Sequence, residues 1–179
     1  MKKKWILIII FILSIIVVSF FIIKKAIWNY KVAHATKVVE LSTNQLTVYQ
    51  NNIKLSNIIK KINGKLTTNP KIDTTKIGRQ EIIFNYTTDE GYPVQHKVEI
   101  EIVDVTPPLI FASKSKTIYT NFEGNLSKEL FCGDNYDPNP KCYIEGEYDT
   151  KTKGEYNLKF VGIDSSNNKS ENSFKLIVR

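Results

Sequence analysis

The feature that most constrains this 179-residue chain is an internal repeat that fills the sequence after residue 40. A gap-free shift places Gly78 on Gly154 and aligns the alternating apolar stretches that follow the two glycines. Nearer the start of each copy, a slightly smaller shift places Leu55 on Leu126. The second copy therefore carries an added loop, which the alignment places between Leu126 and Asp149. Self-similarity at a fixed period indicates one structural unit used twice.

Each copy alternates apolar and polar residues with a period of two. Ile82, Phe84 and Tyr86 share one face of a predicted strand, and residues 98–102 repeat the pattern. Half-buried antiparallel strands have this period, and turn-forming residues separate the stretches. The pattern predicts an all-β fold in which two small β-sandwich modules follow each other, 41–104 and 105–179. The boundary lies at a segment with two prolines, which cannot donate ladder hydrogen bonds. Two smaller expectations are a short helix or irregular crossover around residues 55–62, and a solvent-facing His96 on a strand.

An apolar run without a charge, Trp5–Ile23, precedes the repeat. As a helix it would span roughly 28 Å, close to the ~30 Å hydrocarbon core of a bilayer. We therefore expect a short cytoplasmic tail at 1–4, a transmembrane helix at 5–23 and a juxtamembrane tether at 24–40. The run is longer than the apolar part of a usual signal peptide, so an uncleaved anchor is favoured. Cleavage after Ala35 stays open.

The charge of the chain is concentrated at its N-terminus. Residues 1–37 contain seven lysines and no acidic residue, which leaves 18 basic (25 − 7) and 18 acidic residues for 38–179. A neutral body lacks the basic surface that nucleic-acid binding requires, so this class of function is excluded. Lysines flank the apolar run on both sides and do not decide its orientation.

The two cysteines, Cys132 and Cys142, lie close together in the second copy. The spacing is that of a disulfide formed in an oxidising compartment, which favours a cytoplasmic N-terminus and an extracellular body. A bridge would close an 11-residue loop and stabilise the module by roughly 2.5–3 kcal/mol. Two free buried thiols are the alternative, and a metal site is weaker because no further Cys or His is near.

Four segments carry a resemblance to a known family. They are Val-Asp-Val-Thr-Pro-Pro-Leu-Ile (103–110), Cys-Gly-Asp-Asn-Tyr-Asp-Pro-Asn-Pro-Lys-Cys (132–142), Tyr-Asp-Thr-x-x-x-Gly-x-Tyr (148–156) and Asp-Ser-Ser-Asn-Asn (164–168). Together they resemble the bacterial immunoglobulin-like (Ig-like) modules of Gram-positive membrane-anchored surface proteins, which are related in pattern to hyalin-repeat and cadherin-like domains. Such modules commonly carry glycine where this chain has Asn167, a residue that tolerates the same left-handed turn. The resemblance implies a rigid spacer or binding module outside the membrane.

Two groups of residues are weak candidates for ligand binding. Oxygen-rich side chains at Asp134, Asn135, Asp137 and Asn139 form one loop, which Asp149 and Asp164 could approach to bind calcium. The spacing is not that of an EF-hand, and the same residue types are common in turns, so the metal-free interpretation is favoured. The second group comprises three tyrosines in or beside turns, on which a ligand could stack: Tyr92, Tyr136 and Tyr143.

The chain lacks the residues from which an active site is usually built. His34 falls in the tether and His96 in a strand, so no base stands beside a nucleophile. We therefore predict a protein that is not an enzyme and has no cofactor: a membrane-anchored extracellular spacer or binding protein. Its partners would be the lipid bilayer and a cell-wall polymer or another surface protein. The alternatives are the anchoring stalk of a truncated cell-wall hydrolase and an accessory subunit of a membrane complex.

Overall fold

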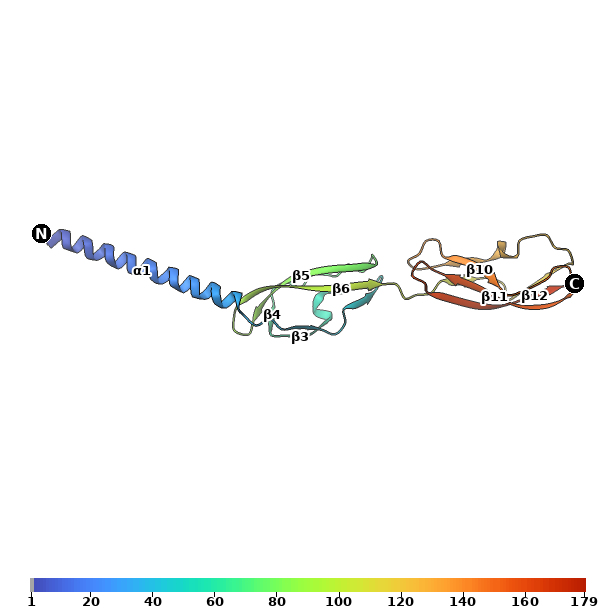
Figure 1. The fold of residues 1–179 in the computed structure, drawn as a ribbon, viewed down its shortest axis with the longest axis horizontal. Helices are drawn as coiled ribbons and strands as arrows, with labels where there is room; N and C mark the ends of the chain where they lie inside the picture. The colour runs from blue at the N-terminus through green and yellow to red at the C-terminus, as the bar shows by residue number, and fades with distance from the viewer. Residues whose placement is uncertain (1) are drawn as a thin grey trace. The chain divides into compact units, whose positions relative to one another are not determined.

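A computed structural model describes residues 2–179, which form an N-terminal helix followed by β-strands, two short 3-10 helices and connecting loops (Figure 1). The chain divides into two compact units, Met1–Ile102 and Val103–Arg179. The division falls two residues before the expected module boundary after residue 104.

Helix α1 (Lys2–Ala33) contains the apolar run and continues beyond it. Its segment Lys3–Ala33 is long and apolar enough to cross a membrane, with a mean hydropathy of 3.5 over its most apolar window. The expected tether therefore begins as helix, because residues 24–33 contain neither proline nor glycine to end it. Non-helical chain begins only after His34, whose backbone N–H still bonds to the carbonyl of Tyr30.

The β-structure of the first unit consists of two sheets. A four-stranded sheet has the order β2 (Gln45–Thr47), β6 (Pro93–Val103), β5 (Gly78–Thr88) and β4 (Gly64–Leu66), and a two-stranded sheet pairs β1 (Val39–Leu41) with β3 (Ile59–Ile62). Figure 1 shows the β5–β6 hairpin on one side of this unit and β3 on the other. Side chains between them form the core, of which the largest fully buried members are Leu55, Ile72, Phe84, Tyr86, Ile100 and Ile102.

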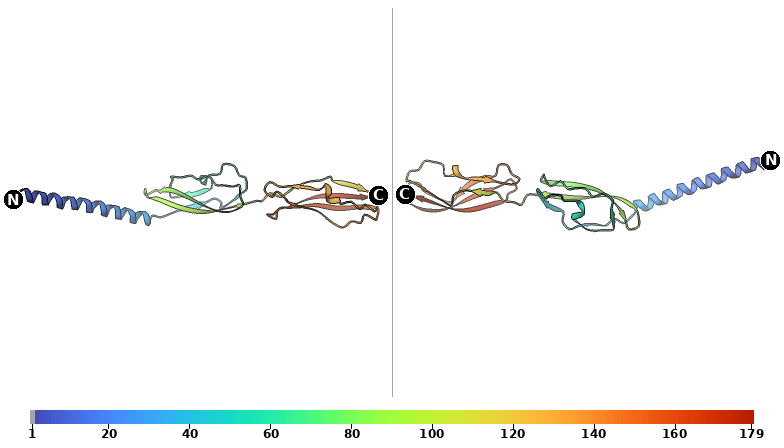
Figure 2. Two further views of the ribbon diagram at one scale, coloured as in Figure 1. Left: turned by 90° about the horizontal axis from the view of Figure 1, so that it is seen from above. Right: turned by 180° about the vertical axis from the view of Figure 1, so that it is seen from behind.

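The second unit has the same plan. Its four-stranded sheet has the order β10 (Lys141–Glu145), β11 (Gly154–Ile163), β12 (Lys169–Val178) and β8 (Ser115–Ile118), and its two-stranded sheet pairs β7 (Leu109–Phe111) with β9 (Phe131–Gly133). Figure 2 shows the red β11–β12 hairpin on one side of the unit and yellow-to-orange segments on the other. Both units are thus sandwich-like, and the second encloses a core built from alternate residues of its strands: Ile118, Leu126, Leu158, Phe160, Phe174, Leu176 and Val178.

The repeat in the sequence is a repeat in strand pairing. Gly78 is opposite Ile102 in the first hairpin, and Gly154 is opposite Val178 in the second. The shift that places Gly78 on Gly154 in the alignment also places Ile102 on Val178. The Cα pairing therefore agrees with the gap-free alignment, and the long strands of one hairpin have direct counterparts in the other. The turns agree as well, because Asn167 (φ 66°) adopts the left-handed conformation that Gly91 (φ 87°) has in the first copy.

The added loop of the second copy connects β9 to β10 and spans residues 134–140, whereas Asn63 alone connects β3 to β4. Its two ends carry Cys132 and Cys142, whose Cα atoms are 6.1 Å apart, within disulfide distance. The gap-free alignment pairs the buried Tyr86 of the first unit with Gly162 of the second. Because Sγ of Cys132 would lie only 3.2 Å from a β-carbon at residue 162, sulfur occupies space beside Gly162 in the second copy.

One local expectation is confirmed only in part, and another differs from the structure. Residues 55–62 form only a single 3-10 turn, Leu55–Asn57, and then enter β3. His96 does not face solvent: it is half-buried opposite Phe84, its ring centroid 5.7 Å from that of Phe84. The physical reason is the strand period itself, because His96 lies two residues from both Val94 and Val98 and shares their inward face.

Candidate functional site

Three carboxylates from distant parts of the sequence meet at one end of the second unit. They belong to Asp104, which precedes β7, Asp134, which follows β9, and Asp164, which follows β11. One oxygen from each side chain lies within 4.8 Å of the other two. Asp104 and Asp164 are only 6% and 5% exposed, and Asp134 is half-buried. The carboxylates are therefore largely withdrawn from water.

Backbone hydrogen bonds fix the orientation of each carboxylate. Oδ1 of Asp104 accepts from the N–H of Thr106 at 3.1 Å, and Oδ1 of Asp134 accepts from the N–H groups of Tyr136 and Asp137. Asp164 accepts from both the backbone and the side chain of Asn168. The same Asn168 side chain also donates to the carbonyl of Asp104 at 3.2 Å, which joins the first and last members of the cluster.

Two oxygens of the cluster have no donor. Oδ2 of Asp104 and Oδ2 of Asp134 are buried, and no hydrogen-bond partner for either occurs among residues 2–179 as described. Buried polar atoms are normally paired, and an exception requires a specific explanation. Two unit charges about 5 Å apart repel by roughly 3 kcal/mol at an effective dielectric constant of about 20. The arrangement is thus costly unless positive charge compensates for it.

Among the described residues of the first unit, the corresponding corner contains no such cluster. Extended along the chain, the repeat alignment places His34 on Asp104, Asn63 on Asp134 and Thr88 on Asp164. Thr88 Oγ1 accepts from the N–H of Tyr92, as Asp164 accepts from that of Asn168, so the hydroxyl fulfils the turn-forming role without a charge. Asn63 closes this corner with neutral hydrogen bonds to the carbonyl of Thr36 and the N–H of Val38. The fold therefore does not itself demand three carboxylates here.

The acidic residues expected to form a calcium site are only partly brought together. Asp134 and Asp164 belong to the cluster. Asp137 borders it and accepts hydrogen bonds from the N–H groups of Asn139 and Ser165, which hold the pKa of its carboxyl below the usual value. Asp149 precedes β11, whereas Asp164 follows it, so the strand separates them by about 30 Å at ~3.3 Å per residue.

Asp149 instead accepts hydrogen bonds within the turn that precedes β11. The hydroxyl of Thr152 and the N–H of Lys151 donate to its carboxylate and lower its pKa.

The residue that sequence reasoning missed is Asp104. It lies in the proline-containing segment at the module boundary, and its only signal was its place within the Val-Asp-Val-Thr-Pro-Pro motif.

The three tyrosines considered for ligand stacking do not form one surface within either unit. Tyr92 belongs to the first unit, where its ring centroid is 5.3 Å from that of Trp28. Tyr136 and Tyr143 belong to the second unit and are half-buried, with Lys141 Nζ 5.5 Å from the centroid of the Tyr143 ring. Stacking of a ligand on these residues remains a prediction.

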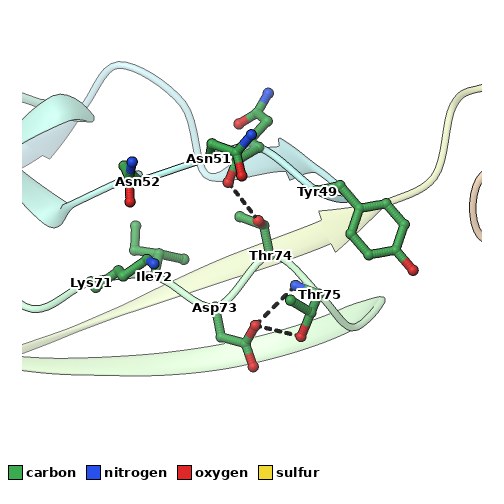
Figure 3. A pocket seen from close by; sticks show the side chains of 9 residues that line it. Tyr49, Asn51, Asn52, Lys71, Ile72, Asp73, Thr74 and Thr75 are labelled. Atoms are coloured by element: carbon green, nitrogen blue, oxygen red, sulfur yellow. Dashed lines mark hydrogen bonds between the residues drawn. The ribbon is translucent and has the colours of Figure 1, made fainter.

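The first unit has a shallow hollow of about 330 Å³ between residues 49–52 and 71–75 (Figure 3). Thr74 donates to the carbonyl of Gln50 across it, and the carboxylate of Asp73 accepts from the hydroxyl and the N–H of Thr75. These bonds lower the pKa of Asp73. The polar groups are thus engaged in local turns, and the hollow is a weaker candidate than the carboxylate cluster.

Comparison with known proteins identifies no family for this chain. A scan of protein-family models finds no match, and a search of curated proteins finds no relative. Among solved structures, the fibronectin(III)-like modules of Clostridium thermocellum CbhA align over 80% of this chain and 94% of that chain, with 10% identity and a TM-score of 0.31. A similarity this low carries no argument, so the sandwich-like description rests on the strand pairing. The resemblance to Ig-like, hyalin-repeat and cadherin-like modules stays a prediction.

Proposed function

We propose that this chain is a non-catalytic protein anchored in the membrane by α1, with its β units outside the cell as a spacer that carries a binding surface. The observation that carries the proposal is the combination of one exposed apolar helix with two copies of the same sandwich-like unit. A duplicated small sandwich adds length and surface outside a membrane without requiring an active site.

An exposed apolar patch on the second unit supports the binding role. Leu109, Phe111 and Phe131 point outward from the β7–β9 sheet and are 67%, 55% and 64% exposed. The two phenylalanine rings lie side by side with centroids 6.0 Å apart. Contiguous apolar surface of this kind marks interaction sites in soluble domains. Its partner is a cell-wall polymer or another surface protein.

Protease treatment of intact bacterial cells that express the full chain tests the location of the units. A tag after Arg179 should disappear from intact cells, while a fragment containing α1 should stay in the membrane fraction. Loss of the tag only after the cells are permeabilised would place the body in the cytosol and contradict the proposal.

The binding role has a separate test. Full-length chain in detergent is incubated with purified wall polymer and, in parallel, cross-linked in intact cells. Replacing Phe111 and Phe131 by serine should remove at least nine tenths of the retained or cross-linked material. Tyr119→Ser, a change at an even more exposed aromatic residue of the same unit, should leave it unchanged. If neither assay detects a partner for the parent chain, only the spacer role stands.

A further inference from the structure

We propose that Asp104, Asp134 and Asp164 bind one calcium ion. Their carboxylates are preassembled, with one oxygen of each within 4.8 Å of the other two, in a part of the second unit that is largely withdrawn from water. Two further features point to a ligand: the buried Asp104 side chain has an oxygen without a donor, and so does Asp134.

The chemistry of the donors selects the ion. The donors that the described residues bring to this corner are carboxylate and backbone carbonyl oxygens, and both cysteines are paired with each other. Hard oxygen donors suit Ca²⁺, which accepts six to eight of them in flexible geometry, with bidentate carboxylates among them. Three aspartates supply up to six oxygens, and the ion offsets two of their three negative charges.

The comparison within the molecule strengthens the inference. At the equivalent corner of the first unit, Asn63 and Thr88 complete the same turns with neutral side chains. Aspartate at all three positions of the second unit is therefore an addition to the fold and not a requirement of its turns. A bound ion explains why three like charges are tolerated at this corner.

The structural effect of the ion follows from the chain segments that it joins. Asp104 lies at the start of the second unit, Asp134 in the loop next to Cys132, and Asp164 at the β11–β12 turn. A calcium ion would tie these three segments together, adding to the hydrogen bonds that Asn168 already makes to Asp104 and Asp164. Residues 103–108 should then resist proteolysis in calcium and lose that protection in a chelator.

The test uses full-length chain in detergent, freed of metal by EDTA and then titrated with CaCl₂ to 10 mM. Calorimetric titration should show one saturable site with a dissociation constant of about 1 mM or below, as in extracellular calcium modules. The midpoint of thermal unfolding should rise with calcium, since a ligand that binds only the folded state stabilises it.

Two substitutions separate binding from folding. In Asp104→Asn and Asp134→Asn, the Oδ1 acceptor for the backbone N–H groups is kept and one negative charge is removed. Each should weaken calcium binding at least tenfold, while in EDTA each should unfold at the same temperature as the parent or above it. Asp149→Asn, a turn aspartate at the other end of β11, should bind as the parent does.

Three results would overturn the assignment. They are no saturable binding by the parent chain up to 10 mM, equal binding by the Asp104→Asn and Asp134→Asn variants, and equal stabilisation by magnesium at the same concentration. Because these measurements do not depend on the side of the membrane or on a partner, they stand apart from the tests of the spacer role.

Discussion

Gly162 illustrates how single residues decide the packing of the second unit. A β-carbon added there would lie 3.1 Å from Ser170 Oγ, 3.2 Å from Cys132 Sγ and 3.3 Å from Ile110 Cγ1. These neighbours come from three different segments, and each would have to move. A side chain at position 162 therefore requires all three neighbours to give way by a few tenths of an ångström, although the equivalent residue of the first unit is a tyrosine.

We therefore expect Gly162→Ala to lower the free energy of unfolding of the second unit by about 1–3 kcal/mol, the usual cost of overpacking a core. Urea unfolding of the full chain in detergent measures the change. Gly154→Ala is the matched control in the same strand, because its β-carbon would meet only Tyr156, at 3.8–3.9 Å. Equal stability of the two variants would contradict the packing described for Gly162.

His96 makes the stability of the first unit depend on pH. Burial among Phe84 and Tyr86 lowers the pKa of His96, and the positive charge of Lys37 adds to the effect. At low pH the unfolded chain therefore binds a proton at His96 that the folded unit does not bind. The contribution of the neutral His96 to the stability of the folded unit is complete above the unfolded pKa of about 6.5, and it is lost as the pH falls below that value. The temperature at which half of the first unit is unfolded should therefore decrease as the pH is lowered from 7 to 5.5.

The substitution His96→Gln should make the unfolding temperature of the first unit less dependent on pH between 7 and 5.5, because it removes the group that titrates. Thermal unfolding of parent and variant at matched ionic strength gives the comparison. Parallel profiles for the two proteins would assign the pH dependence to other groups.

At the level of single residues, the sequence predicts turns better than sites. The left-handed Asn167 could be anticipated because few residue types tolerate that conformation. Asp104 could not be assigned to the cluster, since a carboxylate shortly before two prolines has the same local signature whether it caps a turn or binds an ion. Asp149 could not be separated from the cluster by sequence alone, since only the structure shows that strand β11 lies between it and Asp164.

Among the elements, the β9–β10 connection depends most on covalent chemistry. Cys132 and Cys142 close it, and they lie next to the space left by Gly162. Replacing both cysteines by alanine should destabilise the second unit by roughly 2–3 kcal/mol, mainly because the unfolded chain regains the entropy of an 11-residue loop.

Adding a reductant gives an independent measurement of how much the cysteine bridge stabilises the second unit. It should lower the unfolding midpoint of the second unit and leave that of the first unchanged, because the chain contains only two cysteines. A chain whose thiols react fully with an alkylating agent before reduction would contradict the bridge.

The strand hairpins are the elements that the sequence predicts most completely. Two copies of a period-two pattern at a constant shift define which strands correspond, and one-sided burial sets the register of each pair. The short strands β1, β3, β7 and β9 gave no comparable signal. They have three or four residues each, too few for alternation to be distinguished from an irregular loop.

For the whole molecule, the proposed anchor can be tested by charge. All but three residues of 5–23 are Leu, Ile, Val or Phe, each of which favours insertion by about 0.3–0.6 kcal/mol, while a central arginine opposes it by about 2.5–3.5 kcal/mol. Ile12→Arg alone should therefore leave the chain in the membrane. The double change of Ile12 and Ile16 to arginine should release a large share of it.

Alkaline extraction of membranes measures the released fraction. Ile83→Arg, which places the same charge on an exposed position of β5, controls for solubility effects. Release of the parent chain by the same treatment would indicate that α1 does not span the bilayer.

The two copies differ in what fills one position of the interior: the first has Tyr86, whereas the second has Gly162 with Cys132 and Cys142 beside it. This difference has a consequence for how each copy reaches its final state. The first copy completes its interior with an aromatic ring, using nothing beyond its own side chains. The second brings Cys132 and Cys142 within disulfide distance, and forming the expected bridge removes two electrons from the two thiols. We therefore expect the first copy to reach full stability without an oxidant and the second copy to require one.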